Sequence, residues 1–343
     1  MVKINLALQG GGAHGAFTWG VLDRILEDTD IEIAAITGTS AGALNGAVVK
    51  SGLVRNGREG ARESLDWLWT QVARLDELSI PKWMQAWLPT PGTISNSIEY
   101  SPGFLMSDTF SRMMSPYAWG PFYDNPLEKI VDQLDFDTVC TTKGPQLYVC
   151  ATNVRDGKVR VFEGDWISTQ SILASACLPT LFKAVEVTDP QTGEVEAFWD
   201  GGYTGNPALF PLYHNDLPKD VLIININPLH RDTVPKMPNE IQNRINEISF
   251  NSSLLRELRA IEFVQRLVSE GTVADGAMKK MRVHMIADDQ LMNDLSVATK
   301  MVPVPSVIAA LKAAGRQAAD TFLSQHKADL GTRQTVDLVE MFG

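Results

Sequence analysis

The sequence predicts an α/β fold in which a mostly parallel sheet carries helices on both faces. Apolar, strand-like runs alternate with helix-like stretches: a strand over 4–9, a helix over 14–28, a strand over about 31–37 and a helix of small residues from 43. Both strands run into glycine-rich turns. Alternation at this spacing is typical of a parallel sheet, because each parallel connection has to cross back along the sheet.

The helix over 14–28 and a further helix over 62–75 are predicted from their apolar faces. Large apolar residues recur at helical spacing in both, which places them on one side. They are Phe17, Val21, Ile25 and Leu26 in the first helix and Leu65, Leu68, Trp69 and Val72 in the second.

The stretch 78–125 differs in composition and shows no clean period. It holds many aromatic, Met, Pro and Ser residues, so we interpret it as an insertion or cap rather than as part of the sheet. Its aromatic residues include Trp83, Trp87, Tyr100, Phe104, Tyr117, Trp119, Phe122 and Tyr123.

The rest of the chain predicts more strands followed by a mainly helical C-terminal third. The expected strands are a pair around Asp156-Gly157, a hairpin within 185–199 and an apolar strand over 221–227. The C-terminal part predicts helices over 240–269 and 304–325, with a strand over 281–287. No linker rich in Gly, Ser or Pro divides the chain.

Composition and charge exclude several classes of function. The 343 residues hold 30 Lys and Arg against 41 Asp and Glu, a net charge of −11. Such a chain is a poor ligand for nucleic acid and would not adsorb to anionic lipid by charge alone. Cys140, Cys150 and Cys177 lack metal-site spacing. The chain enters its first strand without a secretion signal and has no apolar run of about 18 residues, so we expect a cytoplasmic protein.

Gly38-Thr39-Ser40-Ala41-Gly42 is a candidate nucleophile turn. Glycines at −2 and +2 allow a sharp turn between strand and helix that exposes Ser40, and the helix directs its N-terminal N–H groups at the same place. The alternative is an ordinary glycine-rich turn in which Ser40 caps the helix.

Gly10-Gly11-Gly12-Ala13-His14-Gly15 also follows a strand and opens a helix. The pattern fits a dinucleotide-binding loop, which needs an acidic residue at the end of the second strand. Asp30 and Glu32 stand at the start of that strand instead. The other interpretation is that Gly10, Gly11 and Gly12 offer backbone N–H groups to an oxyanion.

Asp200, in Phe198-Trp199-Asp200-Gly201-Gly202, is a candidate catalytic carboxylate at the end of a strand, although Asp-Gly also signals a hairpin turn. Serine hydrolases commonly use a histidine base. No histidine after Ser40 stands in a recognisable strand-to-loop site behind an acidic partner. The histidines are His14, His214, His230, His284 and His326.

Together these blocks resemble, in order and spacing, the signature blocks of the patatin-like phospholipase family. A fourth block at 174–182, Ala-Ser-Ala-Cys-Leu-Pro-Thr-Leu-Phe, resembles that family's Ala-Ser-x-x-x-Pro-x-x-Phe stretch. The resemblance implies a three-layer αβα sandwich, a Ser40–Asp200 dyad without histidine, and an oxyanion hole formed by Gly10, Gly11 and Gly12. It also implies that no metal or organic cofactor is needed.

The family usually has Arg or Lys where this chain has His14. A role for His14 and Gly15 in supporting the loop would then depend on pH, because histidine is only partly charged near neutrality. The alternative is that His14 is simply an outward-facing helix residue.

The resemblance covers about 3–230, which we expect to form the catalytic domain, with 78–125 as its cap and 231–343 as a helical extension packed on it. It implies a lipid acyl hydrolase, of phospholipase A or esterase type, that meets a membrane or lipid surface transiently. The aromatic residues of 78–125 suit an acyl pocket or a lid; the alternative, favoured for most of them, is that they pack in an ordinary core. The alternatives are an NAD(P)-dependent oxidoreductase and a catalytically silent lipid-binding protein.

Overall fold

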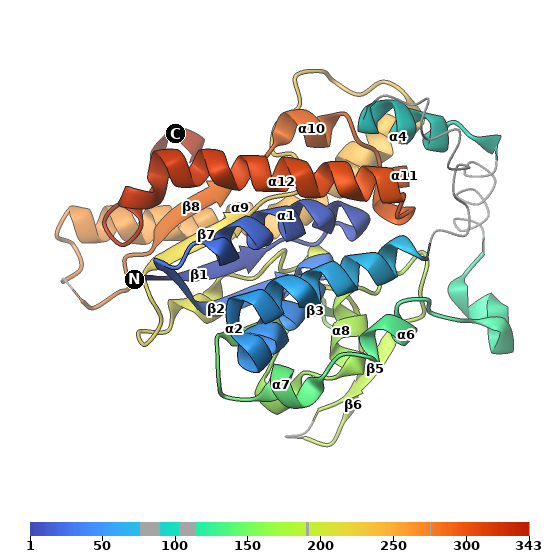
Figure 1. The fold of residues 1–343 in the computed structure, drawn as a ribbon, viewed down its shortest axis with the longest axis horizontal. Coiled ribbons are helices and arrows are strands. Elements are labelled where there is room, and N and C mark those ends of the chain that lie inside the picture. Colours follow the sequence, from blue (N-terminus) through green and yellow to red (C-terminus); the bar gives the residue numbers. More distant parts are fainter. Residues whose placement is uncertain (76–89, 103–113, 190–191, 275, 343) are drawn as a thin grey trace.

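The computed structural model describes residues 1–75, 90–102, 114–189, 192–274 and 276–342 (Figure 1). Its centre is one mixed sheet. The parallel strands, in the spatial order β3-β2-β1-β7-β8, are β1 (Val2–Leu8), β2 (Ile31–Thr39), β3 (Gln146–Asn153), β7 (Asp220–Ile224) and β8 (Arg282–Ile286). The antiparallel strands are β4 (Val159–Glu163), β5 (Val185–Thr188) and β6 (Val195–Asp200). The predicted mostly parallel sheet is confirmed.

Helices cover both faces of this sheet, as predicted. One face carries α1 (Gly15–Glu27), α2 (Ala41–Ala73), α8 (Thr169–Ser175) and α12 (Pro305–His326), and the other carries α9 (Pro238–Ser269) and α13 (Leu338–Phe342). The shorter helices are α4 (Pro91–Glu99), α6 (Glu128–Val131), α7 (Phe136–Cys140), α10 (Asp289–Asn293) and α11 (Val297–Met301). The 3-10 turns are η1 (Gly12–His14), η2 (Pro116–Phe122), η3 (Gly164–Trp166), η4 (Gly201–Tyr203), η5 (Phe210–Tyr213) and η6 (Lys327–Asp329).

The alternation of side chains along each strand separates two hydrophobic cores. In β1, Leu6 and Leu8 point into the core beneath α1 and α2, whereas Ala7 points into the core beneath α9. This follows from the two-residue period of a strand. Because both faces are covered, the parallel strands are buried almost along their whole length.

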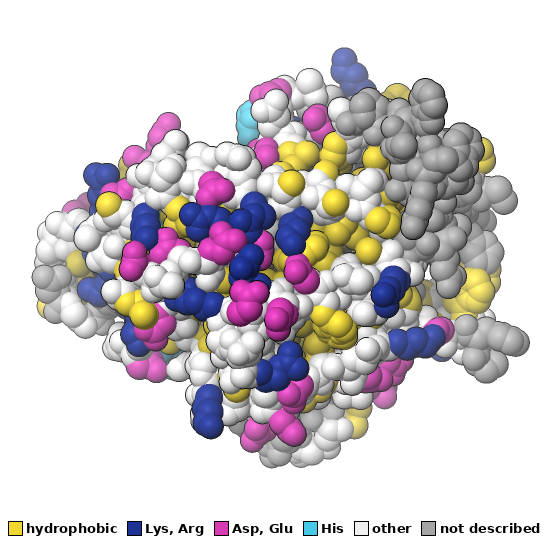
Figure 2. Space-filling view, viewed as in Figure 1, with side chains coloured by type: hydrophobic (Ala, Val, Ile, Leu, Met, Phe, Trp, Pro, Cys, Tyr) yellow, Lys and Arg dark blue, Asp and Glu magenta, His cyan; other side chains and the backbone are white. Residues whose placement is uncertain are grey.

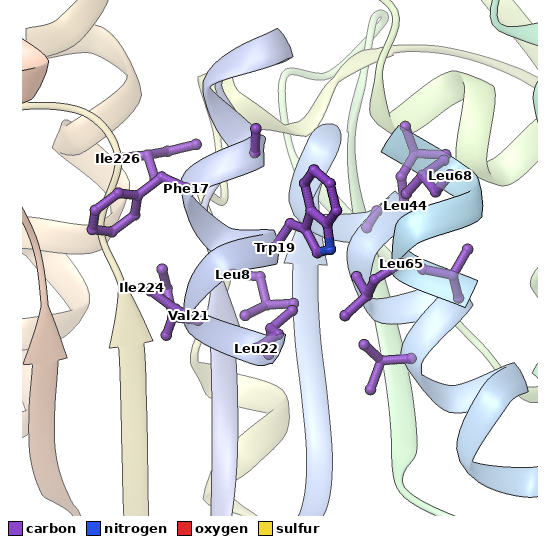
Figure 3. Close-up of a cluster of buried hydrophobic side chains, with 14 of the residues drawn as sticks. Leu8, Phe17, Trp19, Val21, Leu22, Leu44, Leu65, Leu68, Ile224 and Ile226 are labelled. Carbon is purple, nitrogen blue, oxygen red and sulfur yellow. The ribbon is translucent and has the colours of Figure 1, made fainter. Parts of the chain in front are cut away.

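Helix α1 is buried on more than the one face that its sequence pattern predicts. Figure 3 shows Phe17 on the side of Ile226, while Trp19 lies on the side of α2, where its ring stacks 6.2 Å from that of Trp69. The reason is α12, which lies directly over α1 (Figure 1).

Two glycines allow α1 and α12 to approach each other closely. A Cβ on Gly20 would stand 2.0 Å from the carbonyl oxygen of Lys312, and a Cβ on Gly315 would stand 2.1 Å from that of Phe17. Neither position tolerates a side chain without a shift of the helices.

The outer surface of α1, α2 and α12 carries charges of both signs side by side (Figure 2). They form ion pairs between the helices, among them Arg62 with Asp23 at 2.8 Å and Lys312 with Asp66 at 2.9 Å. Exposed pairs such as Lys312 with Asp66 add little to stability, about 0–1 kcal/mol each, whereas Asp23 is buried.

The sheet and one hydrophobic core continue past residue 230. Strand β8 pairs with β7, and α12 contributes Leu311 and Phe322 to the core that contains α1. The predicted domain boundary at 230 stays a prediction. None of the described helices combines the length and the apolarity that a membrane span requires.

Part of the predicted cap lies outside the described residues, including Trp83, Trp87 and Phe104. Within the described part of 78–125, α4 buries Ile94 and Ile98, whereas η2 leaves Tyr117 largely exposed. The hydroxyl of Tyr117 accepts a hydrogen bond from the Ala184 N–H at 3.1 Å, so this segment contacts the chain just after the 174–182 block.

Candidate active site

Ser40 stands in a strained turn between β2 and α2. Its φ of 54° and ψ of −122° make it the one non-glycine residue with positive φ among the described residues. A backbone held in such a region costs about 1–3 kcal/mol and is typical of functional sites. Its hydroxyl makes no capping hydrogen bond to α2, so the interpretation of Ser40 as a helix cap is wrong.

The glycines around Ser40 allow this turn to pack. A Cβ on Gly38 would stand 2.6 Å from the carbonyl oxygen of Gly42, and one on Gly42 would stand 2.1 Å from that of Leu8. Contacts of this length with backbone atoms leave no room for any side chain. The Gly-x-Ser-x-Gly pattern therefore has a steric basis in this chain.

Strand β3 brings Asp200 to the side of Ser40. β4 occupies one edge of β3, so β2 and β6 share the other edge, approaching from opposite directions. Thr39, the last residue of β2, lies opposite Cys150, and Asp200, the last residue of β6, lies opposite Ala151. Consecutive positions on β3 thus place the ends of two distant segments next to each other.

The carboxyl group of Asp200 is buried and strongly perturbed. Only 1% of the residue is exposed, and Oδ1 accepts a hydrogen bond from the Gly202 N–H at 2.7 Å. Burial raises the pKa of Asp200 to about 7, although the hydrogen bonds from Gly202 and from the Ser40 hydroxyl lower it. No described histidine is hydrogen-bonded to Ser40 or to Asp200.

The 174–182 block holds both Ser40 and Asp200 by their backbones. The Ser175 hydroxyl, fully buried at the end of α8, accepts the Ser40 N–H at 2.8 Å and donates to the Cys150 carbonyl at 2.6 Å. The Cys177 carbonyl accepts the Asp200 N–H at 2.7 Å. The sequence singled out this block by resemblance but gave no role to Ser175.

The glycine loop Gly10–Gly12 lies directly over Ser40. A Cβ on Gly10 would stand 2.8 Å from the Ser40 Cβ, and the Gly10 N–H is donated to Asn206 Oδ1 at 2.7 Å. No described residue accepts a hydrogen bond from the N–H of Gly11 or Gly12. Of the three predicted oxyanion donors, these two amides are available.

His14 is buried, so its interpretation as an outward-facing helix residue is wrong. Its exposed fraction is 1%, and its Nε2 lies 2.9 Å from Thr299 Oγ1 in α11. Because that hydroxyl donates to the Ser296 carbonyl, it accepts from Nε2–H. Burial, and then the charge of Lys300, lower the pKa of His14 well below its ordinary value, and Nδ1 has no partner among the described residues. His14 is therefore neutral.

Gly15 joins the starts of α1 and α2. A Cβ there would stand 2.6 Å from that of Ala41, and the Gly15 carbonyl accepts a hydrogen bond from Asn45 at 3.1 Å. The glycine loop and the Ser40 turn are fixed to each other at this point.

A network of buried amides behind the glycine loop was missed in the sequence. Asn227 donates from Nδ2 to the Gly10 carbonyl at 2.8 Å and to Gln9 Oε1 at 3.1 Å. Asn251 in turn donates to the Asn227 carbonyl at 3.2 Å. Asn227 and Asn251 lie more than two hundred positions after the loop and belong to no motif, so only the fold brings them together with it. Among the described residues, no group of three or more His, Cys, Asp or Glu is placed to hold a metal ion.

Comparison with known proteins gives a family match and distant structural likenesses. The family model described as "Patatin-like phospholipase" matches residues 6–213. The structure of VipD from Legionella pneumophila is 14% identical with a TM-score of 0.40, and the alignment covers 94% of this chain and 67% of that one. The ExoU–SpcU complex of the Pseudomonas aeruginosa type III secretion system is 15% identical with a TM-score of 0.32, covering 99% and 65%. No curated protein matches. Likenesses this distant carry no functional argument.

Proposed function

Because the chain belongs to the patatin-like phospholipase family, we propose that it hydrolyses lipid acyl esters with Ser40 as nucleophile and Asp200 as general base. The observation that carries the proposal is the pairing of a strained serine with a buried carboxyl group. The pKa of Asp200, raised by burial to about 7, suits a base that works near neutral pH.

In the acylation step, the Ser40 hydroxyl attacks the ester carbonyl carbon and passes its proton to the Asp200 carboxylate. The proton then goes to the departing alcohol as the carbon–oxygen bond of the ester breaks. This leaves an acyl group on Ser40. Water, deprotonated by Asp200, releases the fatty acid and restores the Ser40 hydroxyl.

The N–H groups of Gly11 and Gly12, which have no acceptor among the described residues, support an oxyanion hole. Each tetrahedral intermediate places a negative charge on the former carbonyl oxygen, and fixed N–H donors in a dry site stabilise it. Removing one such donor typically lowers kcat by about 100- to 1000-fold. The Gly10 N–H, already bonded to Asn206, supports the shape of the loop instead.

The dinucleotide-binding alternative fits this loop poorly. A Cβ on Gly11 would stand 2.8 Å from a side-chain carbon of Ile226, and one on Gly12 would stand 2.3 Å from the Lys300 carbonyl oxygen, so the loop packs on protein rather than on open space. Asp30, at the start of β2, pairs with Lys327. A ribose partner at the end of β2 is absent from the sequence.

A panel of phospholipids, galactolipids and neutral lipids, with products measured by mass spectrometry, tests the proposal. We expect the wild type to release fatty acid and to label with a fluorophosphonate probe, and S40A to do neither. Ser51→Ala, which removes a similarly buried hydroxyl bonded to Thr138, is the matched control. Hydrolysis that persists in S40A would contradict the mechanism, and a wild type that neither reacts nor hydrolyses would favour a silent lipid-binding protein.

A further inference from the structure

Lys300, in α11, lies directly behind the glycine loop and faces it with both its backbone and its side chain. Its carbonyl oxygen is 2.3 Å from where a Cβ on Gly12 would stand, and Gly12 has a φ of +58°. Its ammonium group donates to Asn227 Oδ1 at 2.9 Å. Nothing in the sequence pattern marks this residue, which lies beyond the family match at 6–213.

Asn227 connects this ammonium group to the peptide that carries one of the two available amides. Its Oδ1 accepts from Lys300, and its Nδ2 donates to the Gly10 carbonyl at 2.8 Å. The Gly10 carbonyl and the Gly11 N–H belong to the same peptide unit. Each link of such a chain polarises the next, so a charge at one end makes the N–H at the other end a stronger donor.

We propose that Lys300 is a positioning residue of the active site, whose ammonium group acts through Asn227 and the Gly10–Gly11 peptide to strengthen the Gly11 N–H for the oxyanion. This inference rests on the proposed function and assigns Lys300 no contact with substrate. Because the negative charge develops only on the way to the tetrahedral intermediate, the effect falls on kcat rather than on KM.

Among the charged groups near Lys300, its own ammonium is the one that donates to Asn227 and so to the Gly10–Gly11 peptide. Glu247, in α9, faces Lys300 but is already paired with Arg231 and Arg244. His14, on the other side, is neutral. Burial lowers the pKa of Lys300 to about 8, although Glu247 raises it, and Arg231 lowers it further. The residue is therefore mostly protonated at neutral pH and loses its charge just above.

The test measures kcat and KM for p-nitrophenyl butyrate, and the rate of fluorophosphonate labelling, from pH 5 to pH 10. For the wild type we expect a bell-shaped profile, rising as Asp200 ionises near pH 7 and falling as Lys300 loses its proton near pH 8. In K300M we expect kcat at pH 7.5 to fall about tenfold with little change in KM, and the alkaline fall to disappear. In K300R the alkaline fall should disappear while most of kcat remains, because arginine stays charged throughout this range.

Lys279→Met is the matched control. Lys279 is also partly buried, burial lowers its pKa to about 8, and its ammonium donates to the carbonyls of Leu212 and His214, outside the site. Its replacement should leave the alkaline fall in place. Should K300M fail to fold, the comparison of K300R with the wild type still decides the question.

An alkaline fall that persists in K300M or in K300R, or that vanishes equally in K279M, would overturn the inference, as would a kcat in K300M within twofold of the wild type. Loss of activity in K300M with the alkaline fall intact would mean a structural role only and would also overturn it. These outcomes are separate from failure of the proposed function, which would appear as activity in S40A.

Discussion

Replacing Asp200 by asparagine should stabilise the fold at neutral and alkaline pH while abolishing activity. Asp200 is 1% exposed, and burial raises its pKa from an ordinary 3.8 to about 7. Ionising Asp200 therefore costs more free energy in the folded protein than in the unfolded chain. Asparagine keeps an Oδ1 that can accept the Gly202 N–H, but it never ionises.

The size of this effect follows from the two pKa values. Below pH 3.8 the carboxyl group is protonated in both states, and the penalty is absent. Between 3.8 and about 7 the unfolded chain releases the proton while the folded one keeps it, so stability falls as pH rises. At about 1.4 kcal/mol for each pH unit, the full penalty above pH 7 is about 4 kcal/mol.

Urea unfolding of D200N and the wild type at several pH values measures this difference. We expect D200N to be more stable by about 1.5 kcal/mol at pH 5 and by about 4 kcal/mol at pH 8. A difference that does not grow with pH, or a wild type that is the more stable protein at pH 8, would refute the reasoning about Asp200.

Asp220→Asn is a control of opposite sign. Burial alone would raise the pKa of Asp220, but hydrogen bonds from His284 and Arg282 outweigh it and hold the pKa at about 2. Its charge therefore stabilises the fold above pH 3.8, and that contribution is lost as pH falls through 2. D220N should be less stable than the wild type at pH 8, and the deficit should shrink in acid.

Two further substitutions test how the site and the helices are held. Ser175→Ala leaves the Ser40 N–H and the Cys150 carbonyl without their buried partner, so we expect a loss of about 2–5 kcal/mol in unfolding free energy and a lower kcat. The matched variant is Ser171→Ala, in the same helix, which removes a buried hydroxyl that bonds to no described residue except Ser168. It should lose stability but keep its activity per folded molecule; equal kcat in both variants would contradict the role of Ser175. Gly315→Ala should destabilise the fold by about 1–3 kcal/mol, measured by urea unfolding, because its Cβ would meet the Phe17 carbonyl. Helix propensity alone would make Gly315→Ala more stable by about 1 kcal/mol. A loss of stability would therefore confirm the close contact with α1, and a gain would contradict it.

Local sterics and side-chain periodicity made much of the fold predictable from the sequence. β1, β2, β7 and β8 are short apolar runs, and both faces of their sheet are covered. The Ser40 turn was recognisable because only glycine fits at 38 and 42, whose neighbours are backbone atoms. Information of this kind lies within a few residues and needs no knowledge of the rest of the chain.

The parts that could not be predicted depend on contacts between distant segments. His14 looked like an outward-facing residue because nothing near it in the sequence shows that α11 covers it. In the sequence, nothing distinguishes Asn227 and Lys300 from a surface asparagine or lysine. Only the folding of β7 and α11 brings them behind the glycine loop. Similarly, the adjacency of Ser40 and Asp200 arises from a shared edge of β3, which no single segment reveals.

The packing of α12 on α1 ties the fold to the order in which the chain is synthesised. Arg316 in α12 and Glu27 in α1 are ion-paired although 289 positions separate them. At typical translation rates, α1 leaves the ribosome roughly 15 to 60 seconds before its partner does. During that interval the surface of α1 around Gly20, which α12 covers in the folded protein, is uncovered on the nascent chain and open to non-native contacts.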